Sequence, residues 1–147
     1  MAVSLANIRA NAYTTMYNHL QTGTYKISTD NIHSSYNDTQ SAKEGYPQVI
    51  IEKPIISMEK ITMGRVSPVF HAIVNYNINV FHTSAENAQA IADEVMNKIR
   101  TGLSVFYAVN MKNFIFDEDS TDRVYRGAKS SVHIYRLVII CRYIGSA

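Results

Sequence analysis

Residues 70–80 read F-H-A-I-V-N-Y-N-I-N-V, and this stretch decides the fold class. Apolar and polar side chains alternate along it, which is the pattern of a β-strand with one buried face. The core face is expected to hold the even-numbered positions Phe70, Ala72, Val74, Tyr76, Ile78 and Val80. The other face is expected to meet water or a polar partner through His71, Asn75, Asn77 and Asn79.

Two segments before this strand are rich in β-branched residues. They are residues 46–53 and residues 55–61, with Pro54 between them. Because proline has no amide hydrogen to give to a sheet, Pro54 predicts an edge, a bend or a bulge. The second segment is expected to pair with residues 70–80 around a turn near Gly64.

Two amphipathic helices are expected. The first lies between Ser4 and Gly23, and its apolar stripe is Leu5, Ile8, Ala12, Met16 and Leu20. The second begins at a capping box formed by Thr83 and Glu86 and ends near Gly102. It is expected to pack on the buried face of the 70–80 strand through Ala88, Ile91, Ala92, Val95, Met96, Ile99 and Leu103.

Two further strands are expected near the end of the chain. The first spans about 110–116, and the last, residues 131–144, is apolar on both faces apart from Arg136 and Arg142. A strand of that kind belongs inside a sheet. The predicted fold class is α+β, a mainly antiparallel or mixed sheet of long strands with an N-terminal helix and one amphipathic helix packed on it. Residues 1–147 are expected to form a single domain, large enough to bury a core without disulfides or metals.

A long polar loop is expected at residues 22–45. Serine, threonine, asparagine and aspartate dominate it, and Tyr25 and Tyr36 lie within it. Tyrosine is favoured at interfaces because it covers area at a low entropic cost. Tyr25 and Tyr36 are therefore interface candidates, with core packing as the alternative for the tyrosines as a group. We expect the loop to be an interaction element that orders on assembly.

Composition and charge do not indicate a nucleic-acid or membrane protein. The formal net charge is +2, far from the concentrated basic footprint of a nucleic-acid-binding protein. No stretch approaches the roughly 20 apolar residues of a membrane span. Arg9 lies where a signal peptide would need a continuous apolar core. The expected location is cytoplasmic or particle-bound. Cys141, the single cysteine, is expected to be buried rather than reactive.

The sequence contains none of the common catalytic or cofactor motifs. It has no G-x-x-x-x-G-K-[ST] phosphate loop, no G-x-G-x-x-G dinucleotide turn and no G-x-S-x-G nucleophile elbow. Its five histidines lack metal-ligand spacing, and its acidic run lacks the glycine and terminal glutamate of a calcium loop. We therefore expect no catalytic residue, no metal site and no cofactor.

Residues 117–129 separate charges of opposite sign along one polar segment, which is expected to be a loop. The acids come first and the bases follow: Asp117, Glu118, Asp119, Asp122, Arg123, Arg126 and Lys129. In a head-to-tail ring each subunit presents two different surfaces to its neighbours, so such a segment suits that symmetry. The alternative is that the two halves pair with each other as a hairpin.

The order of these elements resembles that of the tail terminator or tail-completion (head-tail joining) proteins of tailed bacteriophages. The likeness covers most of the chain and lies in the Y-P-Q-V-I-I sequence at 46–51, the helix at 84–100 and the closing strand at 135–140. It implies a non-enzymatic virion protein, assembled in the host cytoplasm, that forms a hexameric ring in the tail. Its implied partners are the tail tube protein and the head-completion or connector protein, and DNA only passes through the lumen.

Two other classes of function stay open. A small-ligand-binding or enzymatic α+β domain needs convergent polar groups, for which His71, Asn75 and Asn77 are the candidates. A nucleic-acid-binding sheet stacks bases on exposed aromatics, yet the polar face of the 70–80 strand has no aromatic before Phe81. The mass of the protein in solution separates these classes, because a large ring favours the structural one.

Overall fold

The computed structural model describes the backbone of residues 5–27, 29–34, 48–62, 69–126 and 131–146. The helical elements are α1 (Leu5–Gln21), the 3₁₀ turn η1 (Thr29–Asn31), α3 (Ala85–Thr101) and α4 (Leu103–Tyr107). The strands are β1 (Ile32–Ser34), β2 (Gln48–Ile51), β3 (Ile55–Thr62), β4 (Val69–His82), β5 (Met111–Arg126) and β6 (Ser131–Ser146). These elements confirm the α+β class, with an N-terminal helix and further helices beside a mixed sheet of six strands.

The sheet has the strand order β1-β2-β4-β6-β5, and β3 pairs with β4 outside this path. β6 occupies one side of β4 along its whole length. β2 and β3 therefore share the other side, where β2 pairs with residues 78–81 and β3 with residues 69–75. The β1–β2 pair is parallel and the other pairs are antiparallel. The predicted inner position of the last strand is confirmed, because β6 has a partner on each side.

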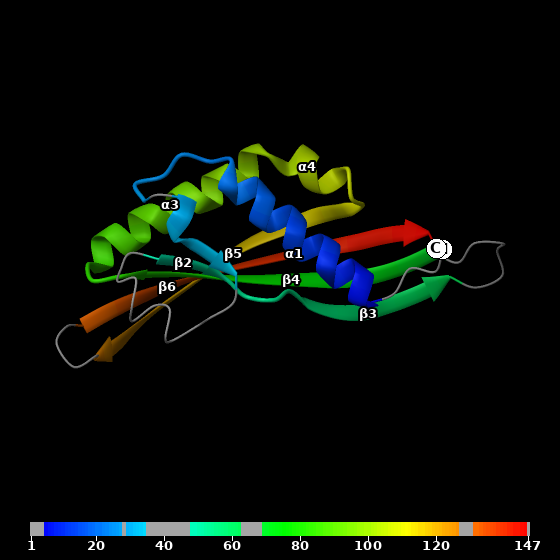
Figure 1. The fold of residues 1–147 in the computed structure, drawn as a ribbon. Coiled ribbons are helices and arrows are strands. Elements are labelled where there is room, and N and C mark those ends of the chain that lie inside the picture. The colour runs from blue at the N-terminus through cyan, green and yellow to red at the C-terminus, as the bar shows by residue number, and fades with distance from the viewer. Residues whose placement is uncertain (1–4, 28, 35–47, 63–68, 127–130, 147) are drawn as a thin grey trace.

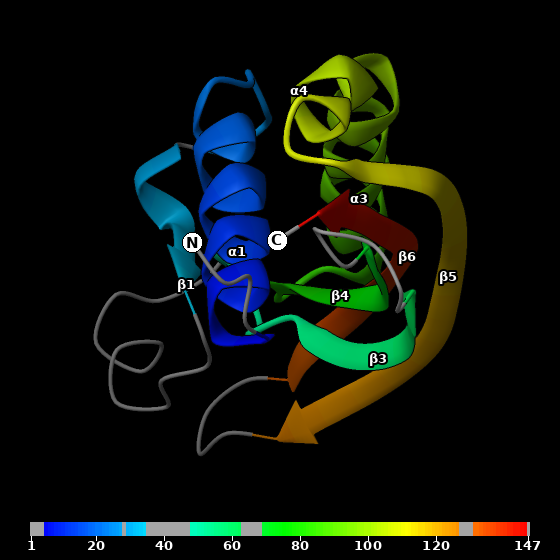
Figure 2. The ribbon, with the colours of Figure 1, turned by 90° about the vertical axis from the view of Figure 1, so that its right-hand side faces the viewer.

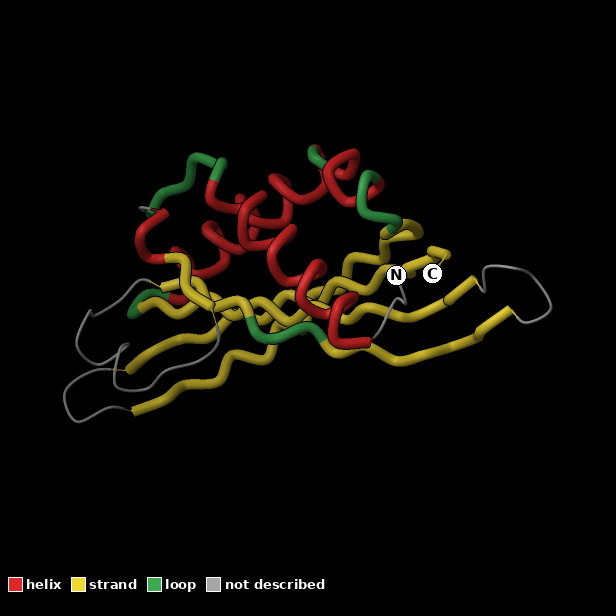
Figure 3. Tube along the Cα trace, turned by 45° about the vertical axis from the view of Figure 1, so that its right-hand side comes forward, coloured by secondary structure: helices red, strands yellow, loops and turns green. Residues whose placement is uncertain are grey.

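The helices α1, α3 and α4 lie together on one face of the sheet, which gives the protein two layers (Figure 1). Figure 2 shows α1 and α3 side by side above the strands. The strands of the β3–β4 and β5–β6 hairpins extend beyond the helical layer at its two ends (Figure 3). The main core lies between the layers, and the described helices cover one face of the sheet.

The alternation of residues 70–80 is confirmed on its core side. The side chains of Ala72, Val74, Tyr76, Ile78 and Val80 are buried. The hydroxyl of Tyr76 donates a hydrogen bond of 2.8 Å to the carbonyl of Ala12, which connects β4 to α1. Because this hydroxyl has a partner, a tyrosine is accommodated in the core without an unsatisfied polar group. The side chain of Phe70 lies outside the described residues, as does the turn expected near Gly64.

Both predicted helices form, and their buried stripes follow the predicted spacing. In α1 the buried apolar residues are Ile8, Ala12, Met16 and Leu20. In α3 they are Ala88, Ile91, Ala92, Val95, Met96 and Ile99. The N-cap of α3 is Ser84 rather than the expected Thr83, because the Ser84 hydroxyl accepts the hydrogen bond from the Asn87 amide. The Gly102 amide donates a hydrogen bond to the carbonyl of Ile99, so the helix ends where it was predicted to end.

Three segments differ from the expectations. The predicted loop at 22–45 contains η1 and β1, and Ile32 of β1 is buried because β1 extends the sheet beside β2. The rest of that segment, 35–45, lies outside the described residues. The predicted loop at 117–129 is strand as far as Arg126, because β5 continues along β6; residues 127–129 are outside the description. Residues 103–107 form a short separate helix that was not predicted, α4, which buries Phe106 against the core.

Among the described residues, every helix is too short or too polar to cross a membrane.

Candidate interaction surfaces

The face of the sheet opposite the helices is uncovered in the described part of the chain (Figure 1). Cross-strand partners on this face come from odd-numbered positions of β4 and even-numbered positions of β6. Several of them are apolar and only half-buried, namely Ile73, Ile134, Val138 and Ile140. On the flanking strands, Ile55 is 57% exposed and Ile115 is 61% exposed. Exposed apolar side chains gathered on one face indicate a contact surface for another protein.

One row of side chains crosses four strands of this face. Ile55 of β3 is the partner of Asn75 of β4, Asn75 is the partner of Ile140 of β6, and Ile140 is the partner of Ile115 of β5. The two exposed isoleucines therefore stand at the two ends of a single row. The Oδ1 atom of Asn75, within the row, is buried and has no hydrogen-bond partner. A row that holds three isoleucines, two of them mostly exposed, is unusual for a face that meets only water.

A polar network lies nearer the β2 end of the same face. Asn79 is 4% exposed, so of the two expected surroundings, water or a polar partner, it has the polar partner. Its Nδ2 donates to Glu52 Oε1 at 3.1 Å, and its Oδ1 accepts from Arg136 Nε at 3.0 Å. Burial is tolerated because both ends of the carboxamide are hydrogen-bonded. Beside the network, Ile50 and Phe81 are buried together with partial cover from Ile134, so this part of the outer face packs on itself.

The structure places the predicted charged segment on β5, at one edge of the sheet. Asp117 is exposed and is the partner of Val138 on the uncovered face. The backbone of Glu118, Asp119, Asp122, Arg123 and Arg126 lies in β5, and Asp119 is the partner of Arg136. Two extra β5 residues form a bulge between Asp119 and Arg123. The side chains from 118 to 126 and the whole of Lys129 lie outside the described residues. Neither the neighbour contact nor the internal pairing is tested by this geometry.

Tyr25 is half-buried beside the end of α1. Its hydroxyl donates a hydrogen bond of 2.8 Å to the carbonyl of Leu20. Burial and, to a smaller extent, the negative charge of Glu94 together raise the pKa of this hydroxyl to about 12. Glu94 in turn accepts a hydrogen bond of 2.7 Å from the Lys26 amide, which connects this turn to α3. The structure thus gives Tyr25 a role in holding the turn after α1, and Tyr36 lies outside the described residues.

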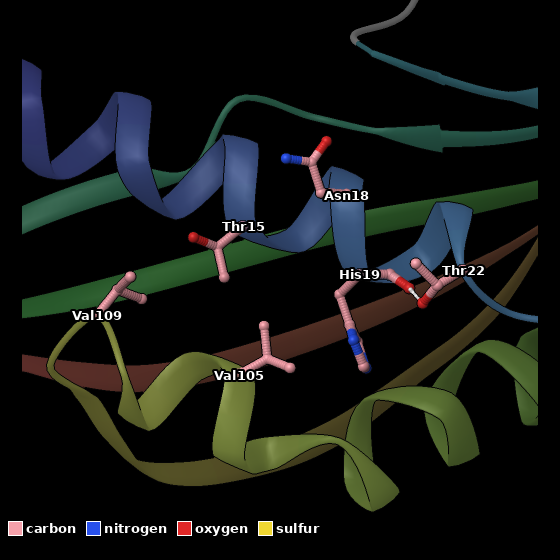
Figure 4. A pocket seen from close by; sticks show the side chains of 6 residues that line it. All are labelled: Thr15, Asn18, His19, Thr22, Val105 and Val109. Carbon is pink, nitrogen blue, oxygen red and sulfur yellow. Dashed lines mark hydrogen bonds between the residues drawn. The ribbon is translucent and has the colours of Figure 1, made fainter.

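A hollow of about 350 Å³ lies between α1 and α4 (Figure 4). Its lining is polar on the α1 side and apolar on the α4 side: Thr15, Asn18, His19, Thr22, Val105 and Val109. His19 is buried, and its Nε2 lies 2.9 Å from the carbonyl oxygen of Lys98. Since a carbonyl only accepts, this nitrogen carries a proton and donates. His19 therefore joins α1 to the end of α3.

A second hollow, of about 380 Å³, is lined by Tyr107, Lys112 and Asn113. The candidates for a ligand pocket, His71, Asn75 and Asn77, line neither of these two hollows. They lie instead along β4, on strand positions that face the uncovered side of the sheet. Among the described residues, no three His, Cys, Asp or Glu side chains are grouped as metal ligands would be.

The pKa values of His82 and Cys141 are also shifted by their surroundings. His82 of β4 is the direct partner of His133 of β6, and its Nδ1 accepts a hydrogen bond of 2.9 Å from the Ser84 amide. Burial lowers the pKa of His82, and His133 lowers it further. The Cys141 thiol is fully buried, and this burial raises its pKa to about 12. A thiol with so little thiolate is a poor nucleophile, in agreement with the expectation of an unreactive cysteine.

A comparison with known proteins finds the same fold in a virus-like particle. One similar chain belongs to a solved structure described as "Virion of native gene transfer agent (GTA) particle". The TM-score is 0.52 at 13% sequence identity, and the alignment covers 98% of this chain and 100% of that chain. The two chains share a fold. No protein-family model and no curated protein matches this sequence.

Sequence reasoning missed the row that ends in Ile55 and Ile115. The signal was present in part, because Ile115 stands between Phe114 and Phe116 in a run that is apolar on both faces. Phe114 and Phe116 pack against the main core, which leaves Ile115 to point outward. The row that Ile115 joins depends on the register between β5 and β6. A bulge between Lys112 and Ile115 shifts that register, so the sequence alone does not give the row.

Proposed function

We propose that this protein is a structural subunit of a phage-like virion and has no catalytic activity of its own. The observation that carries the proposal is the similarity of its fold, over nearly the whole of both chains, to a chain of a gene transfer agent virion. The uncovered sheet face with its exposed isoleucines is consistent with a protein that works through contacts with other proteins.

The specific role that we propose is that of a tail terminator or tail-completion subunit. Such a subunit forms a ring, six-membered by the resemblance, that caps the tail tube and joins it to the head-completion or connector protein. DNA passes through the lumen without being read, which suits a chain whose formal net charge is only +2. The protein would be assembled in the host cytoplasm and would reside in the tail of the virion.

The separated charges of residues 117–129 are proposed to orient neighbouring subunits. Exposed ion pairs contribute only about 0–1 kcal/mol each, so they select orientation while apolar and backbone contacts supply most of the affinity. Reversal of Arg123 and Arg126 to Glu should therefore weaken assembly and leave the subunit folded. The matched control reverses Arg9 and Lys26, which are exposed elsewhere on the chain and change the net charge equally.

The test of the function combines mass and location. Light scattering over a range of concentrations should give a multi-subunit mass with a narrow distribution, and negative-stain images should show rings. Immunogold labelling of purified particles should place the protein at the head-proximal end of the tail. A chain that stays monomeric at high concentration and also on added tail tubes would contradict the ring. Labelling of the capsid shell alone would keep the virion role and reject the terminator role.

A further inference from the structure

The sheet has a free edge on each side in the described part of the chain. β5 pairs with β6 along one side only and ends the strand order. On the opposite side, β3 pairs only with β4, whereas the neighbouring edge of β2 is covered by β1. A long strand with an unpaired edge presents a row of amide and carbonyl groups that another strand can pair with. Among the described strands, β1 also has an unpaired edge but is only three residues long, so β3 and β5 are the two long edge strands at which a further strand can join.

The directions of the two edge strands suit each other. β3 and β6 both run antiparallel to β4, and β5 runs antiparallel to β6. β5 therefore runs in the direction of β4 and opposite to β3. When a second copy is placed beside the first by a rotation about an axis roughly along the strands, the β5 of one copy meets the β3 of the next in antiparallel orientation. The same step repeats from copy to copy, as in a heterologous ring.

The side chains at these edges also suit each other. Ile115 on β5 and Ile55 on β3 stand at the two ends of the same row on the same face, and both are mostly exposed. An antiparallel register that places Ile115 opposite Ile55 also places Asp117, two residues after Ile115, opposite Lys53, which lies two residues before Ile55 and just outside β3. Asp117 and Lys53 are both exposed, and opposite charges on directly facing positions stabilise strand pairs.

We propose that the β5 edge of one copy of this chain pairs antiparallel with the β3 edge of the next, with Ile115 opposite Ile55 and Asp117 opposite Lys53. The occupant of each edge is thus a second copy of the same protein. Backbone hydrogen bonds supply the pairing, the isoleucines bury each other, and the charges select the register. This contact rests on the proposed function, which requires the subunits to assemble but does not say which surfaces meet.

Disulfide cross-linking tests the contact directly. Facing residues of an antiparallel pair have Cα atoms about 4.5–5.5 Å apart, within the range of a disulfide. The double variant Ile55→Cys, Ile115→Cys should give a ladder of covalent oligomers on mild oxidation. Each single variant should give no ladder. Cys141 stays in place because it is fully buried. The matched control is Asn97→Cys with Ile115→Cys, since Asn97 is exposed on α3 in the helical layer and should not cross-link.

A charge swap supplies a second readout that does not depend on oxidation. Ile115→Lys and Ile55→Asp should each raise the dissociation constant of the oligomer tenfold or more. The variant with both changes should associate more tightly than either single variant, because the two new charges face each other across copies. If the combined variant associates more weakly than both, the two residues are not in contact.

The outcomes separate this contact from the function. Rings of full mass with no ladder in the double cysteine variant would overturn the β5–β3 contact and leave the terminator role standing. If cross-linking gives a ladder of oligomers but immunogold labelling never finds the protein at a tail, the contact is supported and the terminator role is overturned. A parent protein that remains monomeric under all conditions would overturn both.

Discussion

Replacement of Gly102 by alanine tests how tightly the helices are joined over the sheet. A Cβ atom at this position would overlap with Cε1 and Nε2 of His19 and would stand 3.3 Å from the carbonyl oxygen of Lys98. The φ of Gly102 is −117°, which alanine adopts without strain, so the cost is steric alone. His19 is buried, and it cannot move aside without leaving its partners.

The magnitude follows from what His19 would lose. Its hydrogen bond to Lys98 contributes about 1 kcal/mol, and its edge contact with the Phe106 ring, 5.6 Å between centroids, contributes about 0.5–1.5 kcal/mol. The lower entropy of the unfolded alanine chain offsets about 0.4–1 kcal/mol. Forcing a methyl group into this packed site adds a further cost, so Gly102→Ala should lower the free energy of unfolding by about 2 kcal/mol in all. For a domain of this size that corresponds to a fall in Tm of about 4–8 °C.

Urea and thermal denaturation of four proteins would measure the effect: the parent, Gly102→Ala, His19→Ala and the combined variant. If the clash with His19 is the cause, alanine at 102 should cost little or nothing in the His19→Ala background. The reasoning is refuted if Gly102→Ala is as stable as the parent, or if its cost is equally large when His19 is absent.

Three further measurements test buried or partly buried groups. Ile91→Asp should cost several kcal/mol in urea denaturation, because it places an unpaired charge in the core, whereas Asn97→Asp on the exposed side of α3 should change stability by less than about 0.5 kcal/mol. The Cys141 thiol should react with a thiol reagent at pH 8 only after unfolding; reaction of the native protein at the unfolded rate would contradict its burial. Because the pKa of His82 is lowered in the folded state, the unfolded chain binds the proton more readily, so stability should be full above the ordinary value of 6.5 and fall as the pH drops below it. His82→Gln should flatten that pH dependence, and an unchanged slope would show that another group causes it.

Much of the local structure could be predicted from the sequence because it depends on short-range periodicity. The alternation along residues 70–80 requires a strand with a core face, and the three- to four-residue spacing in α1 and α3 requires helices with a core stripe. The end of α3 at Gly102 follows from chemistry within a few residues of the helix end. The inner position of β6 follows from its apolar character on both faces.

The errors arose where distant segments decide the outcome. The polar composition of residues 117–126 predicts a loop. Their backbone is nevertheless part of β5, because β6 lies beside it and forms the strand pair. Residues 32–34 become a strand because β2 offers a free edge. Which of its two expected surroundings Asn79 has, water or a polar partner, is likewise decided by distant segments: Glu52, just after β2, and Arg136 of β6 satisfy its carboxamide.

The sequence by itself therefore determined which segments are strands and helices and which of their faces are apolar, since these properties repeat within a few residues. Only the tertiary structure decided which strands lie at the edges and which residues share a row. Ile55 and Ile115 are 60 positions apart and carry no common motif. Strand order and register bring them to opposite ends of one row, and both depend on pairing between segments that sequence periodicity does not specify.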